Sequence, residues 1–205
     1  MKIAISGLTG CGNSTATNNV ASALGLPVVN YTMHNMAAES GMDFEEFHAM
    51  AQKSDAVDIE LDSKIIELAQ KADEQSGGCV VGTRLAGWLL QDADLRVWLH
   101  ASLEVRARRV ASREGLPYAE VLQRVSARDD ADISRYKRIY GVDINDHEGF
   151  DLIVNTEYLT AEQAASLIVA AEKLAKQNRL KKPIKLARHI RDVIEGKKRE
   201  LGVKD

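Results

Sequence analysis

The sequence predicts an α/β fold, with a doubly wound parallel sheet of about five strands and helices on both faces. Two observations carry this prediction. Short apolar runs alternate along the chain with longer segments of helical period, and a glycine-rich turn separates the first run from the first helical segment. At 205 residues the chain can form one domain with a small insertion but not two full domains.

The strands are expected at short apolar runs bounded by turn residues. Right-handed crossovers between such strands place ligands at their carboxyl ends. The expected strands are Lys2–Ser6, Pro27–Val29, Cys79–Val81, Leu95–Leu99 and Leu152–Val154.

The helices are expected where apolar residues recur at helical spacing. Gly77 and Gly78 end the fourth of them, and Thr160 is expected to cap the last, which has Glu162 in its first turn. The expected helices are Ser14–Leu24, Asn35–Met42, Phe44–Ser54, Asp58–Asp73, Leu103–Arg113, Tyr118–Tyr140 and Thr160–Ala175.

The composition excludes several classes of protein. A hydrophobic content of 45% with 28% charged residues is typical of a globular domain and argues against disorder. No apolar run approaches the length of a membrane-spanning helix, so we expect a cytoplasmic protein without membrane contact. Cys11 and Cys79 have no metal-site spacing and are expected to be free thiols.

The glycine-rich turn resembles a phosphate-binding loop. It follows a predicted strand and opens a predicted helix, so backbone N–H groups and the helix N-terminus can converge on phosphate oxygens. Ser14 stands where the pattern G-x-x-x-x-G-K-[ST] places the hydroxyl that binds Mg²⁺. The residues expected to bind the nucleotide phosphates are Gly7, Gly10, Cys11, Gly12, Asn13, Ser14 and Thr15.

Asn13 occupies the position of the lysine in that pattern. The lysine normally bridges the β- and γ-phosphates and follows the charge that develops during transfer, whereas an amide carries no charge. Three interpretations remain open: another cation takes over the role, the protein binds nucleotide but turns over poorly, or the loop binds something other than a triphosphate.

Arginines are concentrated between Ser102 and Arg138. Helical spacing puts Arg106, Arg109 and Arg113 on one face, and Arg124, Arg128 and Arg135 on another. One guanidinium group can donate two hydrogen bonds to the oxygens of a phosphate, so two arginine-bearing helix faces could close on a chain of phosphates. The alternative is a set of surface salt bridges to neighbouring carboxylates such as Glu114 and Asp129.

Several motifs together resemble the archaeal cytidylate kinases, which are P-loop nucleoside-monophosphate kinases. They are spread from residue 1 to about residue 175, so the resemblance does not depend on one string. The motifs are Gly41-Met-Asp-Phe-Glu-Glu-Phe, Asp58-Ile-Glu-Leu-Asp, Arg84-Leu-Ala-Gly-Trp88, Leu103-Glu-Val-Arg-Ala-Arg-Arg, Ala127-Arg-Asp-Asp-Ala-Asp-Ile-Ser-Arg135 and Phe150-Asp-Leu-Ile-Val-Asn-Thr156.

The resemblance implies a kinase domain over residues 1–175, with an acceptor arm at about 31–75 and an arginine-bearing lid at about 106–138. It implies transfer from ATP, with Mg²⁺, to CMP or dCMP, small-molecule nucleotides as partners, and a monomer. Arg84 would hold the acceptor phosphate. The other implied roles are CMP contacts by Arg128, Asp132 and Arg135, lid contacts by Arg109 and Arg113, and catalytic roles for Asn13, Arg109, Arg113 and Arg135.

Two further positions depart from the family pattern. Its Gly-Asp-x-x-Arg arrangement reads Asn30-Tyr-Thr-Met-His34 here, which leaves His34 as a possible phosphate contact, and its Glu-Gly before Arg84 reads Gly82-Thr83. Because these departures and Asn13 all fall at the catalytic centre, two alternatives to a CMP kinase stay open. One is a weakened, nucleotide-binding relative with a regulatory or assembly role, and the other is a kinase for a different phosphorylated acceptor.

The tail, residues 176–205, is expected to form a basic helical extension. Residues 173–205 hold 12 Lys/Arg against 4 Asp/Glu. An apolar stripe of Ile184, Ala187, Ile190, Val193 and Ile194 favours docking on the protein's own body. Contact of the tail with nucleic acid or a protein partner is the alternative.

Overall fold

The computed structural model describes residues 1–51, 54–90, 92–178 and 185–202. In these residues a five-stranded parallel sheet has the order β2-β3-β1-β4-β5, which confirms the predicted fold class. The strands are β1 (Lys2–Gly7), β2 (Val28–Val29), β3 (Cys79–Gly82), β4 (Leu95–His100) and β5 (Leu152–Asn155).

The central strand β1 is buried on both faces, as its apolar sequence predicts. Ile3 and Ile5 belong to one hydrophobic cluster and Ala4 to another, because successive side chains point to opposite faces. Since β1 lies between β3 and β4, its carboxyl end is where the chain connections diverge, the usual ligand position in such sheets.

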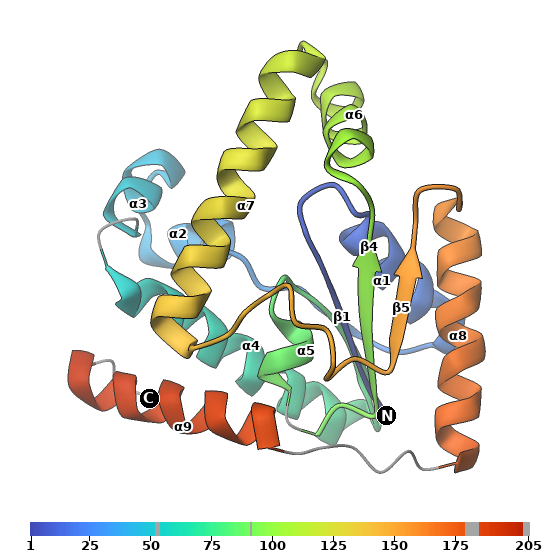
Figure 1. The fold of residues 1–205 in the computed structure, drawn as a ribbon. Helices are drawn as coiled ribbons and strands as arrows, with labels where there is room; N and C mark the ends of the chain where they lie inside the picture. Colours follow the sequence, from blue (N-terminus) through green and yellow to red (C-terminus); the bar gives the residue numbers. More distant parts are fainter. Residues whose placement is uncertain (52–53, 91, 179–184, 203–205) are drawn as a thin grey trace.

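Helices cover both faces of the sheet (Figure 1). On one face α1 (Asn13–Leu24) packs beside α8 (Ala161–Asn178). On the other face lie α4 (Asp55–Ser76) and the four-residue α5 (Ala86–Leu89). The helix α5 was not predicted from the sequence, because so short a helix leaves no periodic pattern.

The segment that the resemblance predicts as an acceptor arm, and which keeps that name below, folds into α2 (Met33–Ser40), α3 (Phe44–Ala51) and α4. The predicted boundaries of α2 were wrong by two residues, because Thr32 forms a capping box with Asn35 and Gly41 ends the helix with a φ of 70°. The start of α4 was predicted three residues late, because Ser54 caps it by accepting from the Ala56 N–H.

The helices α6 (Leu103–Glu114) and α7 (Tyr118–Tyr140) form a hairpin that rises above the carboxyl ends of β1 and β4 (Figure 1). Gly115, with a φ of 68°, ends α6, and Pro117 precedes α7. Both helices agree with the sequence prediction.

The helix α9 (Lys185–Leu201) lies across α4 and α5 (Figure 1). Ile194 is buried and Val193 packs against the same cluster, so the predicted docking on the protein's own body is confirmed for these two residues. Ile184 and the side chains of Ala187 and Ile190 lie outside the described residues. None of the described helices has the length and apolarity needed to cross a membrane.

Candidate active site

The glycine-rich loop connects β1 to α1 in the predicted strand–loop–helix context. Gly10 and Gly12 have φ values of 87° and 91°, which side-chain-bearing residues rarely adopt. A Cβ on Gly10 would also lie 2.7 Å from the Arg106 carbonyl oxygen. No side chain caps the N-terminus of α1, so its first N–H groups remain available to an anion.

Ser14 and Thr15 are exposed on the first turn of α1. Cys11, in contrast, is buried, and burial raises the pKa of its thiol, so Cys11 stays protonated and offers only its backbone to a ligand.

The side chain of Asn13 is held by two neutral hydrogen bonds. Its Nδ2 donates to the Thr83 carbonyl oxygen at 3.2 Å, and its Oδ1 accepts from Thr17 Oγ1 at 3.2 Å. Thr17 in turn lies against Gly82, where an added Cβ would be 2.1 Å from Thr17 Oγ1. The residues at positions 13, 82 and 83, which depart from the expected motifs, therefore contact one another directly or through Thr17.

Two arginines also contact the loop. Arg84, which follows β3, donates from Nη2 to Thr9 Oγ1, and Arg109 of α6 donates from Nη1 to the Gly10 carbonyl oxygen at 3.4 Å. Arg109 also donates to Thr156 Oγ1 at 3.0 Å, beyond the end of β5. Burial lowers the pKa of the Arg84 guanidinium, although arginine keeps its proton in proteins.

Arg106 was predicted on the same helix face as Arg109, but the resemblance implied no individual role for it. It is 5% exposed, and its Nη1 donates to the Thr9 carbonyl oxygen at 3.2 Å and to Asp129 Oδ2 at 2.7 Å. Because these contacts join the loop, α6 and α7, Arg106 anchors the base of the hairpin to the loop.

A chain of ion pairs leads from the loop to the acceptor arm. Arg84 pairs with Asp132 of α7, and Arg135 Nη2 lies 2.8 Å from Asp132 Oδ1. Arg135 Nε lies 3.5 Å from Asp58 Oδ1, and Asp58 belongs to α4. Arg84, Asp132 and Arg135, which the resemblance assigned to the acceptor, therefore form one network that continues to Asp58.

Comparisons with known proteins identify the family of the chain. The model of the cytidylate kinase-like family matches residues 2–158. The chain belongs to the cytidylate kinase-like family. It is 39% identical over 171 residues to "Cytidylate kinase" of Pyrococcus horikoshii, covering 82% of this chain and 86% of that protein. It is 40% identical over 168 residues to "Cytidylate kinase" of Pyrobaculum aerophilum, covering 80% and 89%.

Solved structures support the fold independently. A shikimate kinase from Acinetobacter baumannii, solved in complex with shikimate, matches 88% of this chain and 95% of its own chain with a TM-score of 0.54. At 16% identity this similarity concerns the fold alone.

The remaining predicted site residues of this cytidylate kinase-like chain lie apart from the network. Arg113 is at the tip of the hairpin, has a side chain 66% exposed and pairs with Glu114. Arg128 is exposed on α7, and no ion pair is found for it among the described residues. His34 is exposed on α2 and stacks on Phe44, with ring centroids 3.6 Å apart. The structure brings none of these three to the loop.

A buried pair that was not predicted from the sequence links the acceptor arm to the hairpin. Tyr140 of α7 donates from its hydroxyl to Asp62 Oδ2 of α4. Burial, together with the charge of Asp58, raises the pKa of Asp62 to about 7. The motif Asp58-Ile-Glu-Leu-Asp62 puts both carboxylates on one helix face, which is the sequence signal that could have suggested a shared environment.

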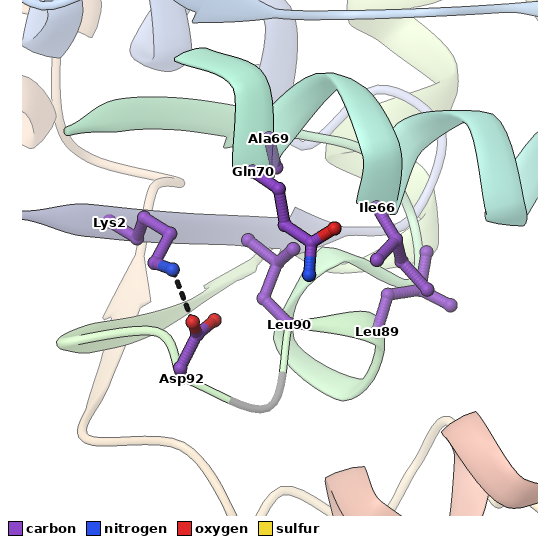
Figure 2. Close-up of a pocket in the computed structure, with 7 residues that line it drawn as sticks. All are labelled: Lys2, Ile66, Ala69, Gln70, Leu89, Leu90 and Asp92. Atoms are coloured by element: carbon purple, nitrogen blue, oxygen red, sulfur yellow. Dashed lines mark hydrogen bonds and ion pairs between the residues drawn. The ribbon is translucent and has the colours of Figure 1, made fainter. Parts of the chain in front are cut away.

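A small cavity of about 80 Å³ lies elsewhere (Figure 2). Ile66 and Gln70 of α4 and Leu89 of α5 line it beside the ion pair of Lys2 and Asp92. Lys2 begins β1 and the phosphate loop follows the other end of that strand, about 16 Å away. This cavity is therefore separate from the candidate active site.

The described residues contain no cluster of three or more His, Cys, Asp or Glu side chains that could hold a metal ion. Mg²⁺ in nucleotide sites needs few protein ligands, because phosphates and water complete its shell. The exposed Ser14 hydroxyl makes no hydrogen bond with the described residues, so it fits the role of a single protein ligand.

Proposed function

We propose that this chain transfers the γ-phosphoryl group of ATP to CMP or dCMP, giving ADP and CDP or dCDP. The observation that carries the proposal is the position of Arg84, which contacts Thr9 of the phosphate loop and pairs with Asp132 of α7. One side chain thus joins the loop for the donor phosphates to the network leading to the acceptor arm. The cytidylate kinase relatives support cytidine as the nucleoside.

Catalysis in this proposal rests on positioning and electrostatics. The reaction needs no covalent intermediate, because the acceptor phosphate oxygen attacks the γ-phosphorus in line as the bond to ADP breaks. Arg84 holds the acceptor phosphate, and Arg128, Asp132 and Arg135 hold the nucleoside. The loop N–H groups bind the donor phosphates, beside Ser14 as the ligand to Mg²⁺, which would neutralise developing charge.

The neutral Asn13 requires a cation from elsewhere. Arg109 is the first candidate, because the fold holds it against the Gly10 carbonyl of the loop. Arg113 is the second and would need the hairpin tip to bend over the nucleotide, a movement that also excludes water.

An assay of nucleotide products tests the proposal. The protein is incubated with ATP, Mg²⁺ and separately with CMP, dCMP, UMP, AMP or shikimate, and the phosphorylated product is quantified by chromatography. We expect CDP and dCDP to form fastest. Turnover only with another acceptor would replace the proposal by a redirected kinase, and ATP binding without any product would replace it by a nucleotide-binding role.

A further inference from the structure

The helix α9 packs behind the ion-pair network of the candidate active site. It lies beyond residues 2–158, the part of the chain that the family model matches, and it contacts α4, α5 and α7 (Figure 1). Arg84 lies two residues before α5, Arg135 belongs to α7 and Asp58 belongs to α4. One helix outside the matched region therefore contacts the three helices from which, or next to which, the network is built.

The contact of α9 with these helices is apolar. Ile194 is 2% exposed and belongs to the same hydrophobic cluster as Leu85 and Tyr136. Leu85 follows Arg84 in the chain, and Tyr136 follows Arg135 and accepts from its Nη2 at 3.3 Å. The two arginines that pair with Asp132 are thus each adjacent to a member of the cluster that contains Ile194.

The side of α5 that faces the sheet is fixed by hydrogen bonds. The Gly87 N–H donates to Ser6 Oγ of β1 at 3.0 Å. Arg96 of β4 donates from Nε to the Gly87 carbonyl oxygen at 3.0 Å and from Nη2 to the Leu90 carbonyl oxygen at 2.9 Å. These bonds hold α5 on the sheet, so its position relative to α4 and α7 depends on side-chain packing, to which α9 contributes.

The phosphate loop is supported by a different hydrophobic cluster. Cys11 of the loop and Val20 of α1 pack with Ile168 of α8, on the opposite face of the sheet from Ile194. A change in packing at Ile194 should therefore affect the acceptor side more than the loop that binds the donor phosphates.

We infer that α9 is a brace for the acceptor site. By packing Ile194 into the cluster shared by α4, α5 and α7, it holds these helices where Arg84 and Arg135 both meet Asp132. Ile194 is thus a positioning residue, which acts through Leu85 and Tyr136 and does not touch the acceptor. Without the brace, an acceptor nucleotide would have to order these arginines itself and would bind more weakly. The inference rests on the proposed CMP kinase activity.

Ile194→Ala tests the inference, with Ile168→Ala as the matched control. Both substitutions remove the same atoms from a buried isoleucine of a helix, on opposite faces of the sheet. Titration calorimetry measures the Kd of CMP and of ADP with Mg²⁺ at a temperature at which every variant is folded. We expect Ile194→Ala to weaken CMP binding about fivefold and to leave ADP binding within about twofold.

Two further variants separate positioning from general stability. Ile168→Ala should lose thermal stability to a similar degree as Ile194→Ala, yet keep the Kd of CMP within about twofold. Ile194→Val keeps most of the buried side chain and should restore the Kd of CMP to within about twofold of the wild-type value.

A second measurement needs no nucleotide. Amide hydrogen exchange reports local opening, and Ile194→Ala should speed exchange in α5 and in the C-terminal half of α7 about tenfold relative to the wild-type protein. Exchange in α1 should change by less than about twofold, because α1 packs in the other cluster. In Ile168→Ala we expect the reverse pattern.

Two results would overturn the inference. One is an unchanged Kd of CMP in Ile194→Ala, and the other is an equal loss of CMP affinity in Ile168→Ala, since either would reduce α9 to a contribution to overall stability. If the wild-type protein neither binds nor phosphorylates CMP, the proposed function fails instead. Hydrogen exchange then decides on the brace alone, which fails if α5 exchanges at the wild-type rate in Ile194→Ala.

Discussion

The two sides of the phosphate loop are held by different chemistry. Towards α1 and β3, Asn13, Thr17 and Thr83 form neutral hydrogen bonds, and Thr17 fills the space above Gly82. Towards α7, the contacts are ion pairs that begin at Arg84 and run through Asp132 to the acceptor arm. The absence of charge at residue 13 is therefore shared by its neighbours Thr17 and Thr83, which we call the neutral side of the loop. The ion pairs from Arg84 towards α7 and α4 form what we call the charged side.

The largest effect is expected from breaking the charged side at Arg84. Among the described residues, Arg84→Met leaves the buried Asp132 with Arg135 as its one ion-pair partner, so the free energy of unfolding should fall by about 3 kcal/mol. If Arg84 holds the acceptor phosphate as proposed, kcat/KM for CMP should fall by about 1000-fold, because that phosphate loses its cation. Chemical denaturation and the product assay measure the two effects.

Arg138→Gln is the matched control on α7, because Arg138 is exposed and pairs with Asp55. Its free energy of unfolding should change by less than about 0.5 kcal/mol. If Arg84→Met behaved like Arg138→Gln in both measurements, the ion pair of Arg84 with Asp132 would contribute neither to stability nor to turnover of CMP.

The next effect concerns the pH dependence of stability and the buried Asp62, one turn from Asp58 on α4. Its pKa of about 7 in the folded protein exceeds the ordinary value of 3.8, so between these values the folded state keeps a proton that the unfolded chain has released. The free energy of unfolding should therefore fall as the pH rises from about 4 to about 7, by on the order of 3 kcal/mol.

Asp62→Asn should remove this slope, and denaturation curves across the pH range would measure it. Asp130→Asn, an exposed substitution on α7, serves as the control and should keep the wild-type slope. A wild-type slope in Asp62→Asn would mean that other groups cause the pH dependence.

A smaller effect tests whether Gly82 and Thr17 are closely packed against each other. Gly82→Ala puts a methyl group into the space of Thr17 and should lower the free energy of unfolding by about 2 kcal/mol. Thr17→Ala in the same chain should recover part of that loss, since it removes the nearest atom. Thermal and chemical denaturation of the single and double variants measure the coupling.

Gly196→Ala is the control for the added methyl group, because a Cβ at that position of α9 meets nothing within 4 Å. It should be neutral or stabilise the protein by up to about 1 kcal/mol. Additive effects of Gly82→Ala and Thr17→Ala would contradict the idea that the two positions are adapted to each other.

The smallest effect is expected at Asn13 itself. Asn13→Ala removes both hydrogen bonds and should lower kcat with CMP by about tenfold. Asn13→Lys should lower kcat by about threefold, because the lysine gains charge but loses the bonds to Thr83 and Thr17. Steady-state kinetics with CMP measure these effects. A rise in kcat for Asn13→Lys would mean that Asn13 weakens the loop as a catalyst.

Sequence alone predicted the strand–loop–helix at residues 1–24, the arginine-bearing helices and the parallel sheet. These features depend on neighbours a few residues apart, such as apolar alternation and glycines that permit positive φ. The resemblance also named Arg84, Asp132 and Arg135, which the fold brings together in one network. The errors at the start of α2 and α4 arose at caps, where one side-chain hydrogen bond moves a boundary.

Only the tertiary structure decided which of several similar residues share an environment. Arg106 and Arg113 are both arginines on the same predicted face of α6, yet the first is buried against Asp129 and the second is exposed at the hairpin tip. Asp58 and Asp62 likewise look equivalent along α4, and only the opposing residues of α7 separate them. The physical reason is that burial and partners are set by segments far away in the chain, which local patterns of charge and periodicity do not encode.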